Sequence, residues 1–269
     1  MSRPSPTVTI MIEAAQAAGK KMVRDFGEVE HLQVSKKGPG DFVSNADKKA
    51  EKIIYEMLAK KRPGYGFLME ESGTIEGTDK SHRFIVDPLD GTTNFLHGMP
   101  HFAISIGLER DGEMHAGVIF DVIKNEIFWA ERGEGAWIEN RRLRVAARRK
   151  LHDSVFATGI PFVGRSGQRE FLVELAAIMP EVAGIRRYGA ASLDLAWVAA
   201  GRFDGFWERG LKPWDIAAGI VLVREAGGKV VGLDGSDVMQ SGDIACGNPS
   251  LCSKLVERLE GKVGGARKA

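Results

Sequence analysis

Two aspartates stand three residues apart in the run Asp87-Pro88-Leu89-Asp90-Gly91-Thr92-Thr93-Asn94-Phe95. The run follows the apolar segment 84–86, which is typical of a short buried strand. Pro88 has no N–H group and fixes φ, so we expect strand pairing to stop there, and Gly91 permits a sharp turn. The two carboxylates are thus predicted on a rigid turn, beside free N–H groups that suit an anion. Carboxylates repel an anion unless cations lie between them, and Mg²⁺ held by carboxylates and a substrate phosphate removes this conflict.

Two further acidic segments carry possible ligands. Glu70-Glu71-Ser72-Gly73 follows the candidate strand 66–69, and Asp215 stands in Trp214-Asp215-Ile216-Ala217-Ala218-Gly219. Taken alone, the first segment is most often a solvated loop. The second is most often a capped helix start, because aspartate is a good N-cap.

Together these three segments resemble the signatures of the inositol monophosphatase family. This family belongs to the superfamily of Mg²⁺-dependent, lithium-sensitive sugar-phosphate phosphatases. The resemblance covers nearly the whole chain. It implies a layered α+β fold, an alternating α-β-α-β-α sandwich. It also implies a phosphate monoester hydrolase, with myo-inositol 1-phosphate as the expected substrate and direct attack of metal-activated water as the mechanism.

The resemblance further implies a cluster of metal ligands. Glu70, Asp87 and the backbone carbonyl of Leu89 would hold a first Mg²⁺, and Asp87, Asp90 and Asp215 a second. A third, more weakly bound ion would lie near Glu70, and Glu70 would itself be a catalytic residue. Li⁺ is expected to inhibit the enzyme. Like charges about 4 Å apart repel by roughly 4 kcal/mol per pair at an effective dielectric of 20. Without cations the cluster would protonate or splay apart.

Other residues match family positions near the reaction. The N–H groups of Gly91 and Thr92 would hold phosphate oxygens. The Thr92 hydroxyl, with Asp47 of the D-x-V-x-x-x-D element as its partner, would orient or deprotonate water. Lys36 matches a lysine on a loop near the metals, although Lys37 beside it leaves this assignment open.

The substrate pocket is expected from residues of both halves. Asp90 would accept a hydrogen bond from the hydroxyl next to the phosphate, and Gly189 and Ala191 match a G-x-A element that lines the inositol pocket. Glu208 matches a carboxylate that accepts hydrogen bonds from ring hydroxyls. The alternative for Glu208, taken alone, is a charge on the protein surface. Departures from the family pattern, Phe42 and Ala190, touch no proposed metal ligand but leave the choice of substrate open.

Alternative functions stay open at this stage. The same metals could serve fructose 1,6-bisphosphate, a 3′-phosphonucleotide, NADP or histidinol phosphate. Such substrates favour additional cations, which Arg186, Arg187, Arg209 and Lys212 could supply. Arg186 and Arg187 could instead lie at a dimer contact. A different class of function is a non-catalytic regulatory role, because some bacterial relatives associate with the transcription machinery.

Composition excludes several classes of protein. The 269 residues carry a formal net charge of +1, with 43% hydrophobic and 27% charged residues, which is ordinary for a globular chain. Because no basic stripe is present, nucleic-acid binding is not expected. There is neither a membrane-spanning apolar run nor a signal peptide, so no membrane partner is expected. Cys246 and Cys252 lack metal-site spacing and favour a reducing compartment. We therefore expect a cytoplasmic protein and, from the resemblance, a homodimer.

Apolar periodicity predicts the elements that position these residues. Helices are expected over 7–26, 46–61, 168–179, 190–200, 214–226 and 249–259. Strands are expected over 32–34, 66–69, 84–86, 154–158, 184–188, 203–207, 229–231 and 244–246, with an antiparallel meander over 102–145. Residues 36–41 and 74–82 are expected as loops, and 261–269 as a disordered tail. We predict two subdomains packed as one catalytic unit. Residues 1–150 would carry most metal ligands, and 151–269 would carry Asp215 and the substrate pocket.

Overall fold

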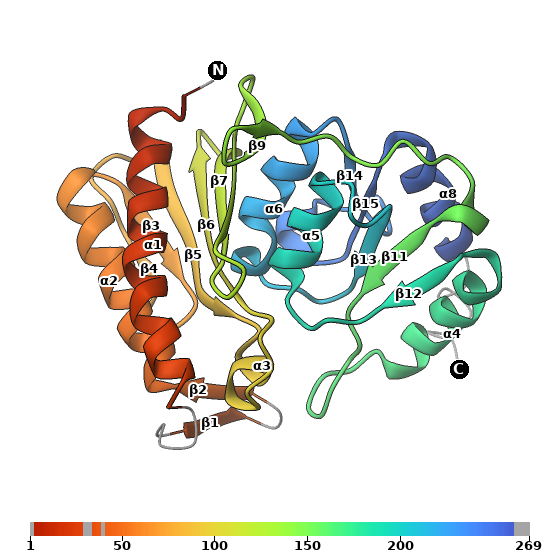
Figure 1. The fold of residues 1–269 in the computed structure, drawn as a ribbon, viewed down its shortest axis with the longest axis horizontal. Coiled ribbons are helices and arrows are strands. Elements are labelled where there is room, and N and C mark those ends of the chain that lie inside the picture. Colours follow the sequence, from red (N-terminus) through yellow and green to blue (C-terminus); the bar gives the residue numbers. More distant parts are fainter. Residues whose placement is uncertain (1–2, 29–33, 39–40, 261–269) are drawn as a thin grey trace.

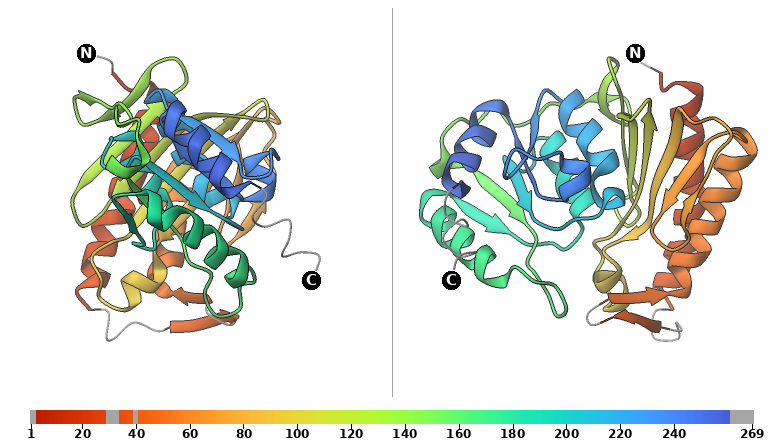
Figure 2. Two further views of the ribbon diagram at one scale, coloured as in Figure 1. Left: turned by 90° about the vertical axis from the view of Figure 1, so that its right-hand side faces the viewer. Right: turned by 180° about the vertical axis from the view of Figure 1, so that it is seen from behind.

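The computed structural model describes residues 3–28, 34–38 and 41–260, and it has five layers (Figure 1). Along the horizontal axis of Figure 1, two helices come first, then a large sheet, two more helices, a small sheet and two outer helices. The right-hand view in Figure 2 shows the same layers from behind, in reversed order. The predicted α-β-α-β-α sandwich is therefore confirmed. The helices of the three helical layers are α1 (Pro6–Phe26) and α2 (Asn45–Lys61), then α5 (Ala191–Ala199) and α6 (Pro213–Glu225), then α4 (Gln168–Ile178) and α8 (Pro249–Leu259).

The large sheet holds eight strands in the order β10-β9-β8-β7-β6-β5-β3-β4. Neighbours from β5 to β10 pair antiparallel, which confirms the predicted meander, and β3 pairs parallel with β5. Its strands are β3 (Gly66–Met69), β4 (Gly73–Ile75), β5 (His82–Asp90), β6 (Ala103–Arg110), β7 (Glu113–Asp121), β8 (Glu126–Glu131), β9 (Gly135–Ile138) and β10 (Arg141–Arg142).

The prediction that pairing stops at Pro88 is wrong in one respect. Asp87 pairs with Ser105, and pairing resumes where Asp90 faces Ala103, so β5 advances three residues while β6 advances two. The strand thus bulges at Pro88, which has no N–H to donate, and then continues. A bulge re-aims side chains, and this one lies between the two aspartates of the first motif.

The small sheet has the order β12-β11-β13-β15-β14. β11 pairs parallel with both β12 and β13, and β15 pairs antiparallel with β13 and β14. Its strands are β11 (Val155–Thr158), β12 (Gly184–Arg186), β13 (Gly205–Glu208), β14 (Lys229–Gly232) and β15 (Ile244–Gly247). The large sheet thus uses residues before position 150 and the small sheet residues after it. The division into two subdomains stays a prediction.

Several short elements differ from the sequence expectation. The segment expected as a loop over 36–41 includes parts of β1 (Val34–Gly38) and β2 (Asp41–Ser44), which pair antiparallel with each other. These strands are fixed by backbone pairing and lack an alternating apolar pattern. The expected loop over 74–82 overlaps β4 and the first residue of β5, and two short helices, α3 (Thr92–Leu96) and α7 (Val238–Ser241), were not expected. Residues 32–33 of one predicted strand and the tail 261–269 lie outside the described residues.

Apolar side chains form three clusters, which fill the four spaces between the five layers. Met11, Ile54 and Phe84 belong to the cluster between α1, α2 and the large sheet. Ile85 and Leu195 belong to the central cluster around α5 and α6, and the outer cluster includes Phe156, Trp207 and Leu255. Adjacent residues of β5 thus serve opposite faces of the sheet, as strand alternation requires. Within the described ranges, no helix is both long enough and apolar enough to cross a membrane.

The contact between α6 and the large sheet decides where Asp215 lies. Gly107 of β6 and Gly117 of β7 face each other across the strand pair. A Cβ atom at Gly107 would lie 2.7 Å from the Cβ of Ala217, and one at Gly117 would lie 2.5 Å from the carbonyl oxygen of Ala218. Two glycines therefore let α6 lie directly on the sheet, and the first turn of this helix carries Asp215.

Candidate active site

The structure brings together the four acids that the sequence motifs suggested. Asp87 and Asp90 lie at the end of β5, Glu70 follows β3, and Asp215 lies in the first turn of α6. The carboxyl groups of Glu70 and Asp215 are both within hydrogen-bonding reach of Asp87. Asp90 adds its charge to the same group. The acids therefore converge from three elements that are distant in the sequence.

Backbone donors hold three of these carboxylates in place. The N–H of Leu89 donates to Oδ1 of Asp87 at 2.9 Å. Oδ2 of Asp90 accepts from the Ser192 N–H at 2.7 Å and from the Ser192 hydroxyl, which ties β5 to the first turn of α5. The N–H of Lys212 donates to Oδ2 of Asp215 at 2.7 Å, at the start of α6.

Glu70 is positioned by a second acid that sequence reasoning did not single out. Glu51 of α2 is buried, and it accepts from the N–H of Glu71 at 2.8 Å and from the Ser72 hydroxyl. The N–H of Glu70 donates to the carbonyl of Val86, next to Asp87 in β5. The turn that carries Glu70 is thus fixed from both sides.

Replacing Glu51 by Ala should lower the free energy of unfolding by about 1–3 kcal/mol, because two hydrogen bonds to a buried carboxylate are lost. The Mg²⁺ concentration needed for half-maximal activity should also rise, since the turn carrying Glu70 loosens. Urea unfolding and a Mg²⁺ titration of activity measure both effects. Glu56→Ala on the exposed face of the same helix is the matched control, because its ion pair with Lys52 is long (3.9 Å) and solvent-exposed. Equal effects of the two variants would contradict this role of Glu51.

The acids have raised pKa values. Burial, then the charges of Glu70, Asp90 and Asp215, raise the pKa of Asp87 well above its usual value. Burial and the charge of Asp215 raise the pKa of Asp90 to about 7, although the Ser192 donors oppose this. Burial raises the pKa of Asp215 to about 6, against the Lys212 N–H and the charge of Arg165. Such a set of hard oxygen donors fits divalent cations, because a cation replaces the proton that each crowded acid otherwise keeps.

Among the described residues, no three His, Cys, Asp or Glu side chains are arranged as a complete ligand set around one point. The acids hydrogen-bond to one another instead: Asp87 bonds with Glu70 and with Asp215. This is the arrangement expected of crowded acids that share protons. The chemistry of the donors, and not a finished coordination geometry, supports a metal site here.

The metal-free protein should lose stability as the pH rises from about 6.5 to 8.5. In this range the folded protein keeps protons on Asp90 (pKa about 7) and Glu208 (pKa about 8) that the unfolded chain has already released. The free energy of unfolding therefore falls with rising pH. His101 changes the free energy of unfolding in the opposite direction, because burial lowers its pKa to about 4. This effect ends near pH 6.5, the ordinary pKa of histidine, and so does not extend into the range above. Thermal unfolding in EDTA and in excess Mg²⁺ tests this, because Mg²⁺ should reduce the slope. A melting temperature in EDTA that rises with pH over this range would contradict the prediction.

A pocket of about 530 Å³ opens beside the acids. Leu89, Gly91 and Thr92 line it on the side of the large sheet, and the Thr92 hydroxyl donates to the Leu89 carbonyl at 3.0 Å. Gly91 has φ 95°, a conformation that favours glycine. The other expected pocket residues, Gly189, Ala191 and Glu208, also line it, as do all four acids.

Among the residues whose side chains the structure describes, one expected site residue does not line this pocket. Asp47 is buried in the first turn of α2. The backbone of Lys36 lies in β1, and its side chain is outside the described part of the structure.

Sequence reasoning missed several residues that the fold brings to the pocket. Gly159 lies under Glu208: a Cβ atom there would be 1.9 Å from the Glu208 carboxyl carbon. Asp194 of α5 is buried, and burial followed by the charges of Glu208 and Asp90 raises its pKa well above the usual value. Arg165 lines the pocket from the loop between β11 and α4. Arg187 lines it too, and the sequence had offered this residue only as a source of charge or as part of a dimer contact. The sequence carries a signal for one of these residues, because Asp194 is an acid within an otherwise apolar helix.

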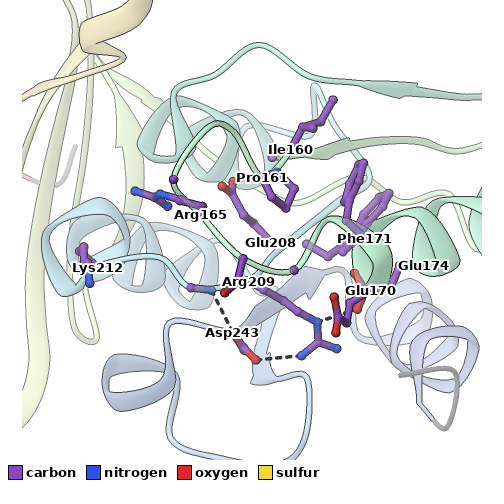
Figure 3. A pocket seen from close by; sticks show the side chains of 16 residues that line it. Ile160, Pro161, Arg165, Glu170, Phe171, Glu174, Glu208, Arg209, Lys212 and Asp243 are labelled. Carbon is purple, nitrogen blue, oxygen red and sulfur yellow. Dashed lines mark hydrogen bonds and ion pairs between the residues drawn. The ribbon is translucent and has the colours of Figure 1, made fainter. Parts of the chain in front are cut away.

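A second pocket of about 490 Å³ adjoins the first (Figure 3). Gly159, Ile160, Arg165, Glu208 and Lys212 line both pockets. Arg209 lies in the second pocket, where its guanidinium is paired with Glu174 at 2.6 Å and with Asp243 at 2.8 Å. The charge of Arg209 is therefore already neutralised by protein groups.

Comparisons with known proteins match this chain over most of its length. The model of the inositol monophosphatase family matches residues 3–263. An inositol-1-monophosphatase of Caulobacter vibrioides is 57% identical over 253 residues, which cover 93% of this chain and 99% of that protein. The Nus factor SuhB of Escherichia coli K12 is 41% identical over 264 residues, 98% of this chain and 99% of that one. The crystal structure of the extragenic suppressor protein suhB from Bartonella henselae superimposes on this chain with a TM-score of 0.93. Its sequence is 56% identical, and the match covers 96% of this chain and 99% of the other.

Proposed function

This chain belongs to the inositol monophosphatase family and is a phosphatase, and we propose that it hydrolyses myo-inositol 1-phosphate to inositol and inorganic phosphate. The observation that carries the proposal is the group of four converging carboxyls at one side of a pocket that has the Glu208 carboxyl among its lining residues. Such a pocket offers a place for a metal-bound phosphate and an acceptor for the hydroxyls of a polyol.

The family is metal-dependent, and we propose Mg²⁺ as the ion. Glu70, Asp87, Asp90, Asp215 and the carbonyl of Leu89 would hold two to three ions, and Li⁺ should inhibit. When bound, the ions would make water more acidic and would stabilise the charge on the phosphate and on the leaving oxygen. The raised pKa values of the acids support this assignment, since each proton can be exchanged for a share of a cation.

The protein's own residues would orient the reactants. The Thr92 hydroxyl donates to the Leu89 carbonyl, so its lone pairs can accept a hydrogen bond from the attacking water and fix its direction. Asp47 is the proposed partner of Thr92 in taking the proton of that water. The N–H groups of Gly91 and Thr92 would hold phosphate oxygens, and Lys36 would add a positive charge nearby.

The inositol ring would be recognised from the opposite side of the pocket. Glu208 would accept hydrogen bonds from ring hydroxyls, and Asp90 from the hydroxyl beside the phosphate. Gly189 and Ala191 would leave room for the ring, because they place no bulky side chain there. Since Glu208 lies over Gly159, any larger residue at position 159 would displace the carboxyl that reads the ring.

The test is phosphate release from a panel of esters, each with Mg²⁺, with EDTA, and with Mg²⁺ plus Li⁺. The panel is inositol 1-phosphate, fructose 1,6-bisphosphate, a 3′-phosphonucleotide, NADP and histidinol phosphate. Release that is strongest on inositol 1-phosphate, lost in EDTA and reduced by Li⁺ is the expected result. If another ester were hydrolysed best, phosphate ester hydrolysis would stand as the reaction, but inositol 1-phosphate would be overturned as the substrate. No Mg²⁺-dependent release from any ester would overturn the proposal.

A homodimer and a cytoplasmic location stay predictions, which sedimentation and cell fractionation can test. The Escherichia coli relative is named as a Nus factor, and this name favours the non-catalytic regulatory role as a second candidate. The two candidates differ in whether the acid cluster is needed. An Asp87→Asn variant should lose a catalytic effect in cells and should keep a purely regulatory one.

A further inference from the structure

A short connection, residues 209–212, joins two of the proposed functional acids. Glu208 is the last residue of β13, and α6 begins at Pro213 with Asp215 in its first turn. Because the connection is short, its conformation affects the direction of the Glu208 carboxyl relative to the acid cluster. The contacts that hold this connection therefore bear on substrate recognition.

The guanidinium of Arg209 bridges the connection to two acids from other parts of the chain (Figure 3). Its Nε donates to Oε1 of Glu174 in α4 at 2.6 Å, and its Nη1 donates to Oδ2 of Asp243 at 2.8 Å. The other oxygen of Asp243 accepts from the N–H of Gly210 at 2.9 Å. The connection is thus tied to an outer helix and to the turn that precedes β15.

The backbone of the same turn holds the rest of the connection. The N–H of Leu211 donates to the carbonyl of Gly242 at 3.0 Å. A Cβ atom at Gly242 would lie 2.0 Å from the carbonyl oxygen of Leu211, so the two backbone segments are in direct contact. Ile244 pairs with Glu208 in the small sheet. Each residue from Glu208 to Leu211 is therefore paired with, or hydrogen-bonded to, the facing segment 242–244.

The charged side chains of this bridge lie outside the active-site pocket. Arg209, Glu174 and Asp243 line the second pocket and not the first, whereas Glu208 lines both. The Glu174 side chain is 2% exposed and that of Arg209 is 23% exposed. Replacing a buried ion pair by apolar side chains of similar volume is often neutral or stabilising, so stability alone does not explain this bridge. We expect its effect on the reaction to pass through Glu208.

We propose that Arg209 is a positioning residue for substrate recognition: its two ion pairs fix the Glu208 carboxyl in the direction that binds the polyol ring. The inference rests on the proposed function, because it takes Glu208 as the acceptor for ring hydroxyls. A guanidinium suits this task, since its planar donors hold two acceptors at a fixed angle. Asp215 has separate supports, a backbone N–H donor and the close packing of α6 on the large sheet. Arg209 should therefore affect binding of the ring and leave binding of phosphate at the acid cluster nearly unchanged.

The test separates recognition of the ring from recognition of the phosphate. The KM for inositol 1-phosphate depends on both, whereas the inhibition constant of inorganic phosphate, a product without a ring, depends on the phosphate site alone. The measured quantity is the ratio of this KM to this inhibition constant, for the wild type, Arg209→Gln, Glu208→Gln and the double variant. We expect each single variant to raise the ratio roughly tenfold, with kcat changed by less than about threefold. The double variant should raise it no further than Glu208→Gln alone, because Arg209 acts through Glu208. Arg209→Lys, which keeps the charge but loses the fork of donors, should lie between the wild type and Arg209→Gln.

Arg148→Gln is the matched control. Arg148 donates from Nε to the buried carboxylate of Asp204 at 2.6 Å, which is the same kind of contact that Arg209 makes with Glu174. This pair lies at the opposite end of β13, because Asp204 precedes Gly205, the first residue of the strand. Arg148→Gln should lower the melting temperature, as Arg209→Gln should, but it should leave the ratio unchanged.

The outcomes distinguish this inference from the proposed function. If Glu208→Gln raises the ratio and Arg209→Gln does not, the inference is overturned and the proposed function stands. A double variant whose effect equals the product of the two single effects also overturns it, since the two residues would then act independently. A ratio that Glu208→Gln leaves unchanged overturns the proposed role of Glu208 and this inference with it. No Mg²⁺-dependent hydrolysis of inositol 1-phosphate would overturn the proposed function itself.

A second variant keeps the test decisive if Arg209→Gln does not fold. Asp243→Asn removes the charge of one partner, while its side-chain oxygen can still accept from the N–H of Gly210. It should raise the same ratio, by less than Glu208→Gln does. An unchanged ratio in folded Asp243→Asn would contradict the inference in the same way.

Discussion

Replacing Asp87 by Asn should lower kcat/KM for inositol 1-phosphate by about 10³-fold or more. Asp87 is the acid that contacts both Glu70 and Asp215, so it is the ligand that two proposed ions would share. An amide offers one neutral oxygen where the carboxylate offers two charged ones, so both ions would be weakened. A loss of about 4 kcal/mol of transition-state stabilisation corresponds to this change in rate. Phosphate release at saturating Mg²⁺ measures it.

The same variant should make the metal-free protein more stable. Asp87 is buried among three other acids, and its pKa is raised well above the usual value, so its ionisation opposes folding. Asn removes that charge and keeps the shape. In EDTA near pH 8 the melting temperature should therefore rise, while the further rise on adding Mg²⁺ should shrink. A variant that is inactive and also less stable in EDTA would indicate a damaged fold, which contradicts this account.

Asp111→Asn is the matched control for this pair of effects. Asp111 is exposed in the turn between β6 and β7, and its φ of 52° is one that Asn adopts readily. The same chemical change there should leave both activity and the Mg²⁺-dependent shift in melting temperature unaltered. If it changed either one, charge alone and not ligation would explain the Asp87 result.

The elements with strong apolar periodicity could be predicted closely from the sequence. The strand Gly66–Met69 was expected at its observed bounds, and the first helix was expected one residue late because Ser5 caps it and Pro6 begins it. The hairpin of β1 and β2 could not be predicted, since its residues show no alternation. The bulge at Pro88 was equally hidden, because it depends on the partner strand β6.

The acids of the candidate site could be proposed because each lies in a short, ordered motif. The residues that hold them could not. Ser192 bonds to Asp90 across 102 positions, and Glu51 bonds to Ser72 across 21. Arg165 lies in a loop whose sequence shows no reason to face Glu208. Such contacts arise only when the two sheets and the helices between them are packed, so local patterns carry no trace of them.

Replacing Gly117 by Ala should both destabilise the protein and weaken the site. The added Cβ atom would lie 2.5 Å from the carbonyl oxygen and 2.8 Å from the Cα atom of Ala218, which belong to the backbone of α6. The helix must therefore shift, at an expected cost of about 1–3 kcal/mol in the free energy of unfolding. Asp215 lies three residues earlier in that helix, so the Mg²⁺ concentration for half-maximal activity should rise as well. Urea unfolding and a Mg²⁺ titration measure these effects.

Gly27→Ala is the control, because Gly27 has φ −67° and its nearest neighbour to an added Cβ lies at 3.5 Å. It should change stability by no more than about 0.5 kcal/mol. A second comparison distinguishes backbone from side-chain clashes. At Gly107 the nearest atom to an added Cβ is the Cβ of Ala217, so Ala217→Gly should partly rescue Gly107→Ala, with a coupling of about 1 kcal/mol in a double-mutant cycle. Ala218→Gly should not rescue Gly117→Ala, because the backbone atoms that clash are still present. Rescue in both pairs would show that α6 yields easily on the sheet, and the close seating of this helix would then not be what places Asp215.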